Sequence, residues 1–395
     1  MTEKKAPILR FKGFTDAWEQ RKLGEIGEIT TGSTPSTLNK DFYNGPYKFV
    51  SPVDINENRF IETTATTLSK LGFEKGRNIK RGSSLFVSIG STIGKVAQIH
   101  DVVTTNQQIN AVIPFDNMEN DYIFTLIEKH SGTIRGLAAV QAVPIINKTT
   151  FSNVQLNISL DIEEQTKIGV IFKILDNTIS LHQRKLERLN MLKKAYLQQL
   201  FPQANEKIPK LRFASFNMDW EQRKFKTIAA RVSQTSDSDS LPKVEFEDII
   251  CGEGRLNKDI SNKFDSRKGI IFESNDILYG KLRPYLKNWL FADFKGIALG
   301  DFWVLRATNT SPIFNFYLIQ SEKYQSVADL STGTKMPRSD WKVVSDTEFE
   351  IPRDLAEQTK IGDLLKNLDV TVSLHQDKLK KLKILKKAYL QKMFI

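Results

Sequence analysis

An internal duplication constrains the fold of this chain more than any other feature. Residues 7–11 (PILRF) return 202 positions later as residues 209–213 (PKLRF), and residues 18–22 (WEQRK) return at the same offset as residues 220–224. A repeat of about 200 residues is far too long for a solenoid, whose repeats run to roughly 20–50 residues. The sequence therefore predicts two related halves with pseudo-two-fold symmetry.

A second repeated element ends each half. Residues 164–201 return as residues 357–394 with an offset of 193 residues, and about two-thirds of the positions are identical. The stretches 41–141 and 242–334, by contrast, share no long run. Two nearly identical frames therefore hold two different inserts.

The longer element predicts a helix. Residues 165–201 contain no proline and only Gly169 as glycine, and their apolar positions recur at spacings of three and four, as in a coiled-coil seam. A helix of about 38 residues reaches about 57 Å at 1.5 Å per residue. A pseudo-dyad makes two such helices antiparallel, so we expect them to pack together; the alternative is that each lies on its own domain. Asp176 and Asp369 suggest N-caps or a break. The predicted seam positions are Leu175, Ile179, His182, Leu186, Leu189, Tyr196, Leu368, Val372, His375, Leu379, Leu382 and Tyr389.

The repeats predict four segments in the 395-residue chain. They are a globular domain in residues 1–160, a helix in 161–203, a second domain in 204–353 and a second helix in 354–395. Within the domains, β-rich runs bounded by Gly, Asn and Asp turns alternate with short helical stretches at 122–128 and 314–325. This pattern favours a mixed α/β (α+β) fold for both domains.

The charge indicates an acidic or polyanionic partner. The net charge is +11, and most of the excess lies in the helices, with seven basic against three acidic residues in 164–201 and nine against four in 357–395. A merely solvated helix face is the alternative. The N-terminus shows no signal peptide and the longest uncharged stretch is too short for a bilayer, so we expect a cytoplasmic protein with no membrane contact.

The sequence contains no complete catalytic or cofactor motif. Residues 90–96 (GSTIGKV) imitate a phosphate-binding loop, but have three residues between the glycines instead of four and Val96 where Ser or Thr would hold Mg²⁺. Residues 44–47 (NGPY) differ by one residue from the NPPY signature of N6-adenine methyltransferases and are interpreted as a turn. One cysteine, Cys251, and four scattered histidines suggest no metal site. The chain is therefore expected to bind rather than to catalyse.

The repeated residues resemble the conserved helices of the specificity subunits of type I restriction-modification systems. The helix motif EQ-x-KIG is followed by LD, LHQ, KL and LKKAYLQ in both copies, and the order of domain, helix, domain, helix matches over the whole chain. Motifs inside the domains add to the resemblance: residues 31–35 (TGSTP), 90–96 (GSTIGKV), 281–284 (KLRP) and 333–338 (GTKMPR).

The resemblance implies a DNA-recognition subunit that is not itself an enzyme. Each domain would read one half of a split, asymmetric target in double-stranded DNA, and the antiparallel helices would set the gap. Two methyltransferase subunits would dock on the conserved region and methylate adenine at N6, and two translocase-nuclease subunits would complete the complex. S-adenosylmethionine, ATP and Mg²⁺ would belong to those partners and not to this chain.

Polar and basic loop residues are the candidates for contact with bases or phosphates, because Arg and Lys suit guanine, and Asn and Gln suit adenine. Each of them alone is also consistent with a solvated loop. The first domain contributes Thr31, Ser33, Thr34, Ser91, Thr92, Lys95, Gln107 and Gln141. The second contributes Lys281, Arg283, Tyr285, Lys287, Thr334, Lys335 and Arg338. Arg10, Arg212, Trp18 and Trp220 are interpreted instead as frame residues that tie each domain to its helix.

Two other functions fit parts of the pattern. A self-contained DNA enzyme would need a cofactor or metal site in this chain and would bind S-adenosylmethionine alone. A coiled-coil adaptor between proteins would bind its partners without salt sensitivity and without DNA-sequence preference.

Overall fold

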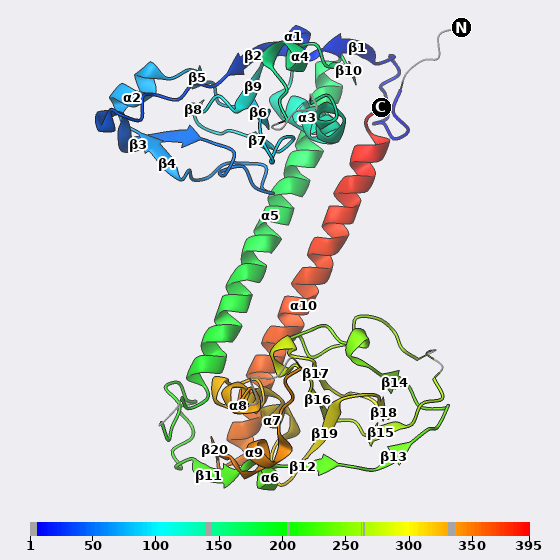
Figure 1. The fold of residues 1–395 in the computed structure, drawn as a ribbon. Coiled ribbons are helices and arrows are strands. Elements are labelled where there is room, and N and C mark those ends of the chain that lie inside the picture. The colour runs from blue at the N-terminus through cyan, green and yellow to red at the C-terminus, as the bar shows by residue number, and fades with distance from the viewer. Residues whose placement is uncertain (1–5, 139–143, 204–205, 262, 264, 331–335) are drawn as a thin grey trace. The chain divides into compact units, whose positions relative to one another are not determined.

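The computed structural model describes residues 6–138, 144–203, 206–261, 263, 265–330 and 336–395. The chain divides into two compact units, Met1–Arg184 with Asp377–Ile395, and Lys185–Gln376. Each unit holds one globular domain, the helix segment beside it and the last part of the other long helix (Figure 1). The predicted mixed α/β fold, with two duplicated domains and two long helices, is confirmed.

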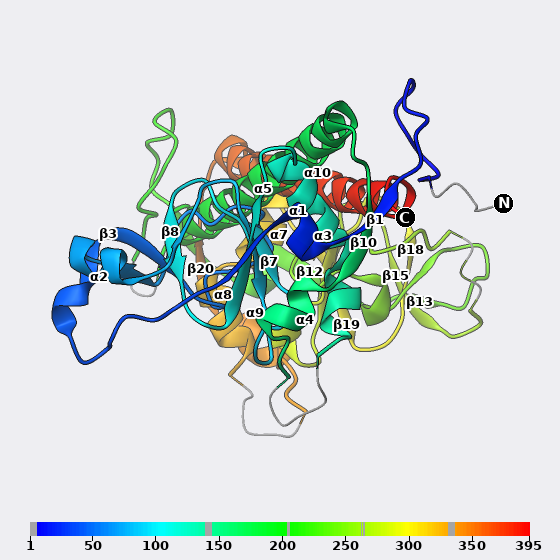
Figure 2. The same cartoon turned by 90° about the horizontal axis from the view of Figure 1, so that it is seen from above.

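The first domain contains two four-stranded sheets and one strand pair. The sheet orders are β2-β9-β6-β7, β4-β3-β8-β5 and β1-β10. Viewed from above, α2 and β3 lie at one end of this domain, and α3 lies at the other end beside α5 (Figure 2). The elements are β1 (Glu19–Lys22), α1 (Leu23–Ile26), β2 (Gly27–Thr31), η1 (Lys40–Phe42), β3 (Tyr43–Val50), β4 (Thr66–Leu68), α2 (Lys70–Lys75), β5 (Asn78–Ile79), β6 (Ser84–Val87), β7 (Val96–Gln98), β8 (Val103–Thr105), β9 (Ile109–Pro114), α3 (Asn120–Arg135), α4 (Lys148–Ser152) and β10 (Gln155–Ile158).

The second domain contains the same set of sheets, but the fourth strand of the middle sheet lies at the opposite edge. Its sheets are β12-β19-β16-β17, β13-β15-β18-β14 and β11-β20, so each sheet of the first domain has a counterpart despite the unrelated inserts. The elements are β11 (Glu221–Lys224), α6 (Phe225–Ile228), β12 (Ala229–Val232), β13 (Thr235–Ser236), β14 (Lys243–Val244), η2 (Phe246–Asp248), β15 (Gly269–Phe272), β16 (Ile277–Gly280), η3 (Pro284–Leu286), β17 (Trp289–Phe291), β18 (Gly296–Ala298), β19 (Phe302–Ala307), α7 (Pro312–Leu318), α8 (Glu322–Ala328), α9 (Trp341–Asp346) and β20 (Glu348–Ile351).

Two local expectations differ from the structure. The helix expected over residues 314–325 is two helices, because the hydroxyl of Ser321 accepts from Tyr324 N and caps the start of α8. Residues 44–47, interpreted as a turn, lie inside strand β3. Asn44 has a φ of 63° there, and the pairing with β4 shifts register between Tyr43 and Tyr47, so the local irregularity is a β-bulge.

The two long helices are α5 (Ile162–Gln199) and α10 (Leu355–Lys392). Asp176 and Asp369 lie within them, so the expected caps or breaks were wrong. Each carboxylate instead binds a lysine of the other helix: Lys386 Nζ lies 2.5 Å from Asp176, and Lys193 Nζ lies 2.6 Å from Asp369. The two ion pairs occupy equivalent positions in the repeat, since 193 residues separate both the aspartates and the lysines.

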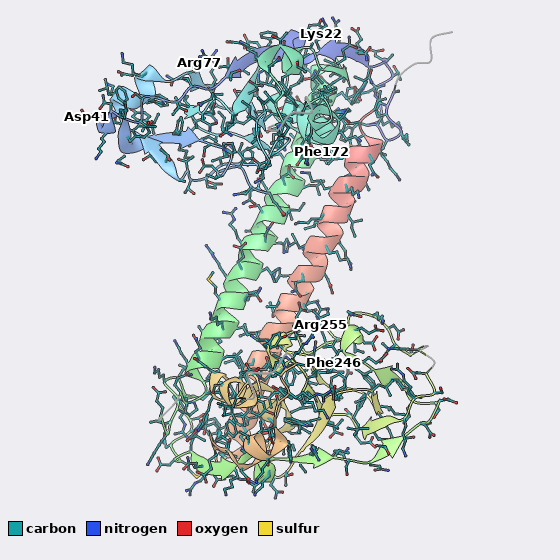
Figure 3. The ribbon with its side chains drawn as sticks, viewed as in Figure 1. Lys22, Asp41, Arg77, Phe172, Phe246 and Arg255 are labelled. Atoms are coloured by element: carbon teal, nitrogen blue, oxygen red, sulfur yellow. The ribbon has the colours of Figure 1, made fainter. Side chains whose placement is uncertain are left out.

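The C-terminal end of each long helix packs against the domain that precedes the other helix: α10 ends on the first domain, and α5 ends on the second. In the first unit, Met393 and Phe394 belong to the buried core, and the Phe394 ring lies 5.8 Å from that of Phe172 on α5. Phe172 is labelled in Figure 3. In the second unit, Leu200 and Phe201 are buried in the same way. Since Phe172 faces Phe394 and the later Asp176 faces the earlier Lys386, the two helix segments of the first unit run antiparallel. Packing of each helix on its own domain alone is therefore excluded.

The helix faces differ in exposure. The predicted seam side chains are all at least partly buried, and Val372 is only 8% exposed. A second set of apolar side chains on the same helices is exposed, including the equivalent pairs Leu181 with Leu374 and Leu192 with Leu385. Within the described part of the chain, no helix is long and apolar enough to cross a membrane.

Candidate nucleic-acid interface

The topology gathers the candidate residues at one edge of a sheet in each domain. In β2-β9-β6-β7 all neighbours are antiparallel, so the end of β2, the start of β9, the end of β6 and the start of β7 meet at the same edge. The order β12-β19-β16-β17 produces the same edge in the second domain. We call these the first loop edge (residues 31–34, 88–95 and 105–110) and the second loop edge (residues 281–288 and 299–302, with residues 336–339 beside them).

At the first loop edge, the polar side chains bond one another. Thr31 Oγ1 donates to Asn110 Oδ1 at 2.6 Å, and Thr34 Oγ1 donates to Gln107 Oε1 at 2.6 Å. Ser33 is half-buried and its backbone N–H donates to Thr105 O, so Ser33, Thr34 and Gln107 are held side by side. These bonds fix the orientation of Thr34 and Gln107, both of which are exposed.

The β6–β7 connection holds the other candidates of the first domain. Gly90 and Gly94 have φ values of 97° and 96°, which glycine adopts without strain. Between them, Ser91 is exposed and Thr92 is half-buried. Lys95 is exposed, but its ammonium donates to Ile55 O at 3.0 Å. The connection leads into strand β7 and not into a helix, so it lacks the helix N-terminus with which a phosphate-binding loop holds nucleotides.

At the second loop edge, the basic residues surround one carboxylate. Arg338 Nη2 lies 2.9 Å and Lys281 Nζ lies 3.6 Å from the carboxylate of Asp301. Leu282 forms an isolated bridge with Arg338, and Arg283 N donates to Pro337 O at 2.8 Å, which holds residues 336–339 beside the β16–β17 connection. Arg283, Tyr285 and Lys287 are exposed.

The structure thus places the described candidates of each domain along one edge. Three candidates, Gln141, Thr334 and Lys335, lie outside the described residues. The first domain shows a related contact at this edge, where Gly90 N donates to Pro144 O at 3.1 Å. Pro144 and Pro337, which are 193 residues apart, therefore each accept a hydrogen bond from the connection between two hairpin strands: β6–β7 in the first domain and β16–β17 in the second.

Sequence reasoning missed one cation at the first loop edge. Arg77, labelled in Figure 3, is exposed and donates from Nη1 to Thr31 O at 2.8 Å. It comes from the segment between α2 and β5, 46 residues away along the chain. No local motif marks it, because only the pairing of distant strands brings it to this edge.

The frame residues behave as predicted. Arg10 donates through Nε and Nη2 to both carboxylate oxygens of Glu164, at 2.5 and 2.9 Å, and Trp18 Nε1 donates to the same carboxylate at 3.2 Å. The hydrogen bond and charge of Glu164 raise the pKa of Arg10 above its usual value.

The second unit contains the same arrangement of one arginine and one tryptophan on a buried glutamate, which we call the clasp. Arg212 donates to both oxygens of Glu357 at 2.7 and 2.8 Å, and Trp220 Nε1 donates at 3.3 Å. A charged, bidentate clasp of this kind fixes the orientation of the planar guanidinium. Each domain is therefore joined to the first turn of its own helix by the same three side chains.

A buried ion cluster was also missed. The Arg59 guanidinium, whose side chain is 2% exposed, binds Asp121 at 2.9 Å and Asp176 of α5 at 3.1 Å. Lys386 of α10 joins Asp176 to Glu128 of α3, and burial raises the pKa of Glu128. The cluster connects an insert loop, α3 and both helix segments of the first unit.

In the second unit, fewer polar side chains surround Asp369, which is the counterpart of Asp176 in the repeat. Asp369 accepts from Lys193 and, at 2.8 Å, from the Tyr317 hydroxyl. Arg255, labelled in Figure 3, reaches Gln376 of α10 at 3.1 Å. The shared Lys–Asp pair thus belongs to the frame, and the remaining contacts belong to the divergent inserts. Among the described residues, no group of three or more His, Cys, Asp or Glu side chains is placed to hold a metal ion.

Comparison with known proteins agrees with this architecture. Residues 15–191 and 217–384 match the type I restriction modification DNA specificity domain, once in each half. The HindI specificity subunit of Haemophilus influenzae is 29% identical over 170 residues, 41% of this chain and 37% of that protein. The MjaVIII specificity subunit of Methanocaldococcus jannaschii is 20% identical over 385 residues, covering 90% of this chain and 87% of that protein.

A solved structure supports the fold. The type I restriction-modification S subunit from M. genitalium superposes with a TM-score of 0.70 at 15% identity and covers 99% of both chains. The duplicated domains and long helices define a two-domain protein of the specificity-subunit architecture. With both halves matched, the chain belongs to the type I restriction modification DNA specificity family.

Proposed function

We propose that this chain is the DNA-specificity subunit of a type I restriction-modification complex and that it carries no catalytic site of its own. Each domain reads one half of a bipartite, asymmetric target in double-stranded DNA. The observation that carries the proposal is the pair of loop edges: the same sheet topology presents two different sets of side chains. Because the two edges carry different DNA-contacting side chains on equivalent sheets, the two half-sites that they recognise must differ in sequence.

The chemistry of the two edges supports this division. The first edge exposes hydroxyl and amide groups beside Arg77 and Lys95, and among them Gln107 suits adenine. The second exposes Arg283, Lys287 and Arg338, which suit guanine edges or phosphates. The net charge of +11 favours a polyanion and predicts binding that weakens as salt rises.

The long helices are proposed to set the gap between half-sites and to dock two methyltransferase subunits. The duplicated exposed side chains support docking, since Leu181 and Leu374 are 62% and 64% exposed, and Met191 and Ile384 are 63% and 59% exposed. Two equivalent apolar sets suit two identical partners. Translocase-nuclease subunits would join through the methyltransferases, and S-adenosylmethionine, ATP and Mg²⁺ would bind to those partners.

The test is a map of N6-methyladenine in a host genome with and without this chain, with the methyltransferase partner present in both. The proposal predicts a split asymmetric motif with a fixed gap that appears only when the chain is present. An unchanged map, together with partner binding that is insensitive to salt and to DNA sequence, would favour a protein adaptor. Binding of S-adenosylmethionine to the isolated chain would instead indicate a self-contained enzyme.

A further inference from the structure

The β16–β17 connection presents two neighbouring apolar side chains to solvent. Tyr285 and Leu286 are 55% and 41% exposed at its tip, whereas Pro284 before them is buried. Arg283 and Lys287, on either side of this turn, are exposed as well. The tip is therefore an apolar pair between two cations, on the edge that we propose binds DNA.

The backbone of this tip is fixed in a conformation that side chains disfavour. Arg283 has φ 49° and ψ 62°, and Lys287 has φ 57° and ψ 42°, both in the left-handed region. Residues other than glycine keep this conformation only where the surroundings impose it, and such positions gather at functional sites.

Several backbone hydrogen bonds impose it here. Arg283 N donates to Pro337 O, Lys287 N donates to Pro284 O, and Lys287 O accepts from Gly252 N, all at 2.8–2.9 Å. Gly280 N closes the hairpin by donating to Asn288 O at 2.7 Å. The apolar pair is thus held out on a rigid turn.

We propose that Tyr285 and Leu286 form a wedge that partly unstacks one base step of the half-site bound by the second domain. This inference rests on the proposed function. Apolar side chains inserted at a base step unstack it and kink the duplex, and flanking cations neutralise the phosphates on either side. Arg283 and Lys287 are placed to do the latter.

The equivalent connection of the first domain, described over residues 90–94, has no such exposed apolar pair, which provides an internal control. In its equivalent connection, residues 90–94, Ser91 is exposed and polar, and the apolar Ile93 is only 5% exposed. The distortion is therefore expected in one half-site only.

The experiment uses the full chain with its methyltransferase partner, without S-adenosylmethionine, on a duplex carrying both mapped half-sites. The fluorescent base 2-aminopurine is placed in the first or the second half-site, away from the adenine that is methylated. We expect a several-fold rise of fluorescence on binding in the second half-site and none in the first. The double variant Tyr285→Ala with Leu286→Ala should lose that rise and bind about tenfold more weakly. The matched variant Val343→Ala, which removes an exposed apolar side chain of α9 away from the loop edge, should retain it.

A second measurement needs no variant. A mismatch at the wedged step removes most of the cost of unstacking, so it should tighten binding of the unaltered chain several-fold in the second half-site and not in the first. Sequence-specific binding with equal fluorescence and equal mismatch response in both half-sites would overturn the wedge alone. Absence of any sequence-specific binding would instead overturn the proposed function.

Discussion

The clasp between the first domain and α5 predicts a large effect of one substitution, Glu164→Ala. The Glu164 side chain is 0% exposed and its partner Arg10 is 12% exposed. The substitution leaves a guanidinium and the Trp18 N–H without their shared acceptor, and breaking a buried ion pair in this way costs about 3 to 5 kcal/mol. Arg10 keeps its 2.7 Å bond to Asp16 O and some access to water, so we expect the lower end of that range.

Calorimetric unfolding of the full chain measures this effect. A loss of about 3 kcal/mol lowers the Tm of a unit of about 200 residues by about 6 to 12 °C. The control is Glu163→Ala, which lies on the same turn but is exposed, and it should change stability by less than about 0.5 kcal/mol. Glu357→Ala should produce the equivalent loss in the second unit. A loss below about 1 kcal/mol for Glu164→Ala, or additive effects of Arg10→Ala and Glu164→Ala in the double variant, would refute the reasoning.

Three further predictions follow from named side chains. Burial lowers the pKa of His130 from 6.5 to about 4, so the unfolded chain binds the proton first as pH falls. Stability should therefore decline from about pH 6.5 towards pH 4, and thermal melts of His130→Gln should show a smaller decline than the unaltered chain; identical pH profiles would contradict this. Arg283→Ala should cost about 1–3 kcal/mol of binding to the second half-site only, measured by DNA titration, whereas an equal loss on unrelated DNA would make Arg283 a phosphate contact. Leu186→Lys with Leu379→Lys, at half-buried seam positions, should lower thermal stability and disturb the methylated pattern. Leu181→Lys with Leu374→Lys, at exposed positions, should leave the thermal melt unchanged but prevent copurification with the methyltransferase. If this second pair lowered thermal stability and the first pair only prevented copurification, the proposed seam and docking faces would be reversed.

The repeat made the frame predictable from the sequence. Because Arg10 and Trp18 return as Arg212 and Trp220 at a common offset, their shared role was visible, and the clasps to Glu164 and Glu357 confirm it. The apolar spacing of residues 165–201 likewise predicted a long helix, since helix periodicity is a local property.

Contacts made over long separations were not predictable in the same way. The cap or break expected at Asp176 is wrong because a mid-helix aspartate resembles a cap until its partner is known, and Lys386 lies far away in the sequence. The equal offsets of the two Lys–Asp pairs were a signal that could have revealed them. Arg59 gave no such signal, because it lies in an insert, 117 residues from Asp176, and its neighbourhood is not repeated.

The loop edges show the same limit for the candidate site. Residue types selected Thr34 and Ser91 in the first domain and Arg283 in the second, but only strand order shows that the candidates of each domain gather at one edge of its own sheet. Arg77 lies at the first loop edge only because strand pairing brings it there, and no sequence motif indicates this position.

The most direct test of bipartite reading exploits the duplicated frame. Residues 209–356 are replaced by residues 7–163, so that the first domain occurs twice on otherwise unchanged helices, and N6-methyladenine is mapped in a host that supplies the methyltransferase. We expect a symmetric motif in which the half-site of the first domain occurs twice as an inverted repeat. Retention of the original asymmetric motif by a folded, methylating variant would contradict the claim that each domain reads its own half-site.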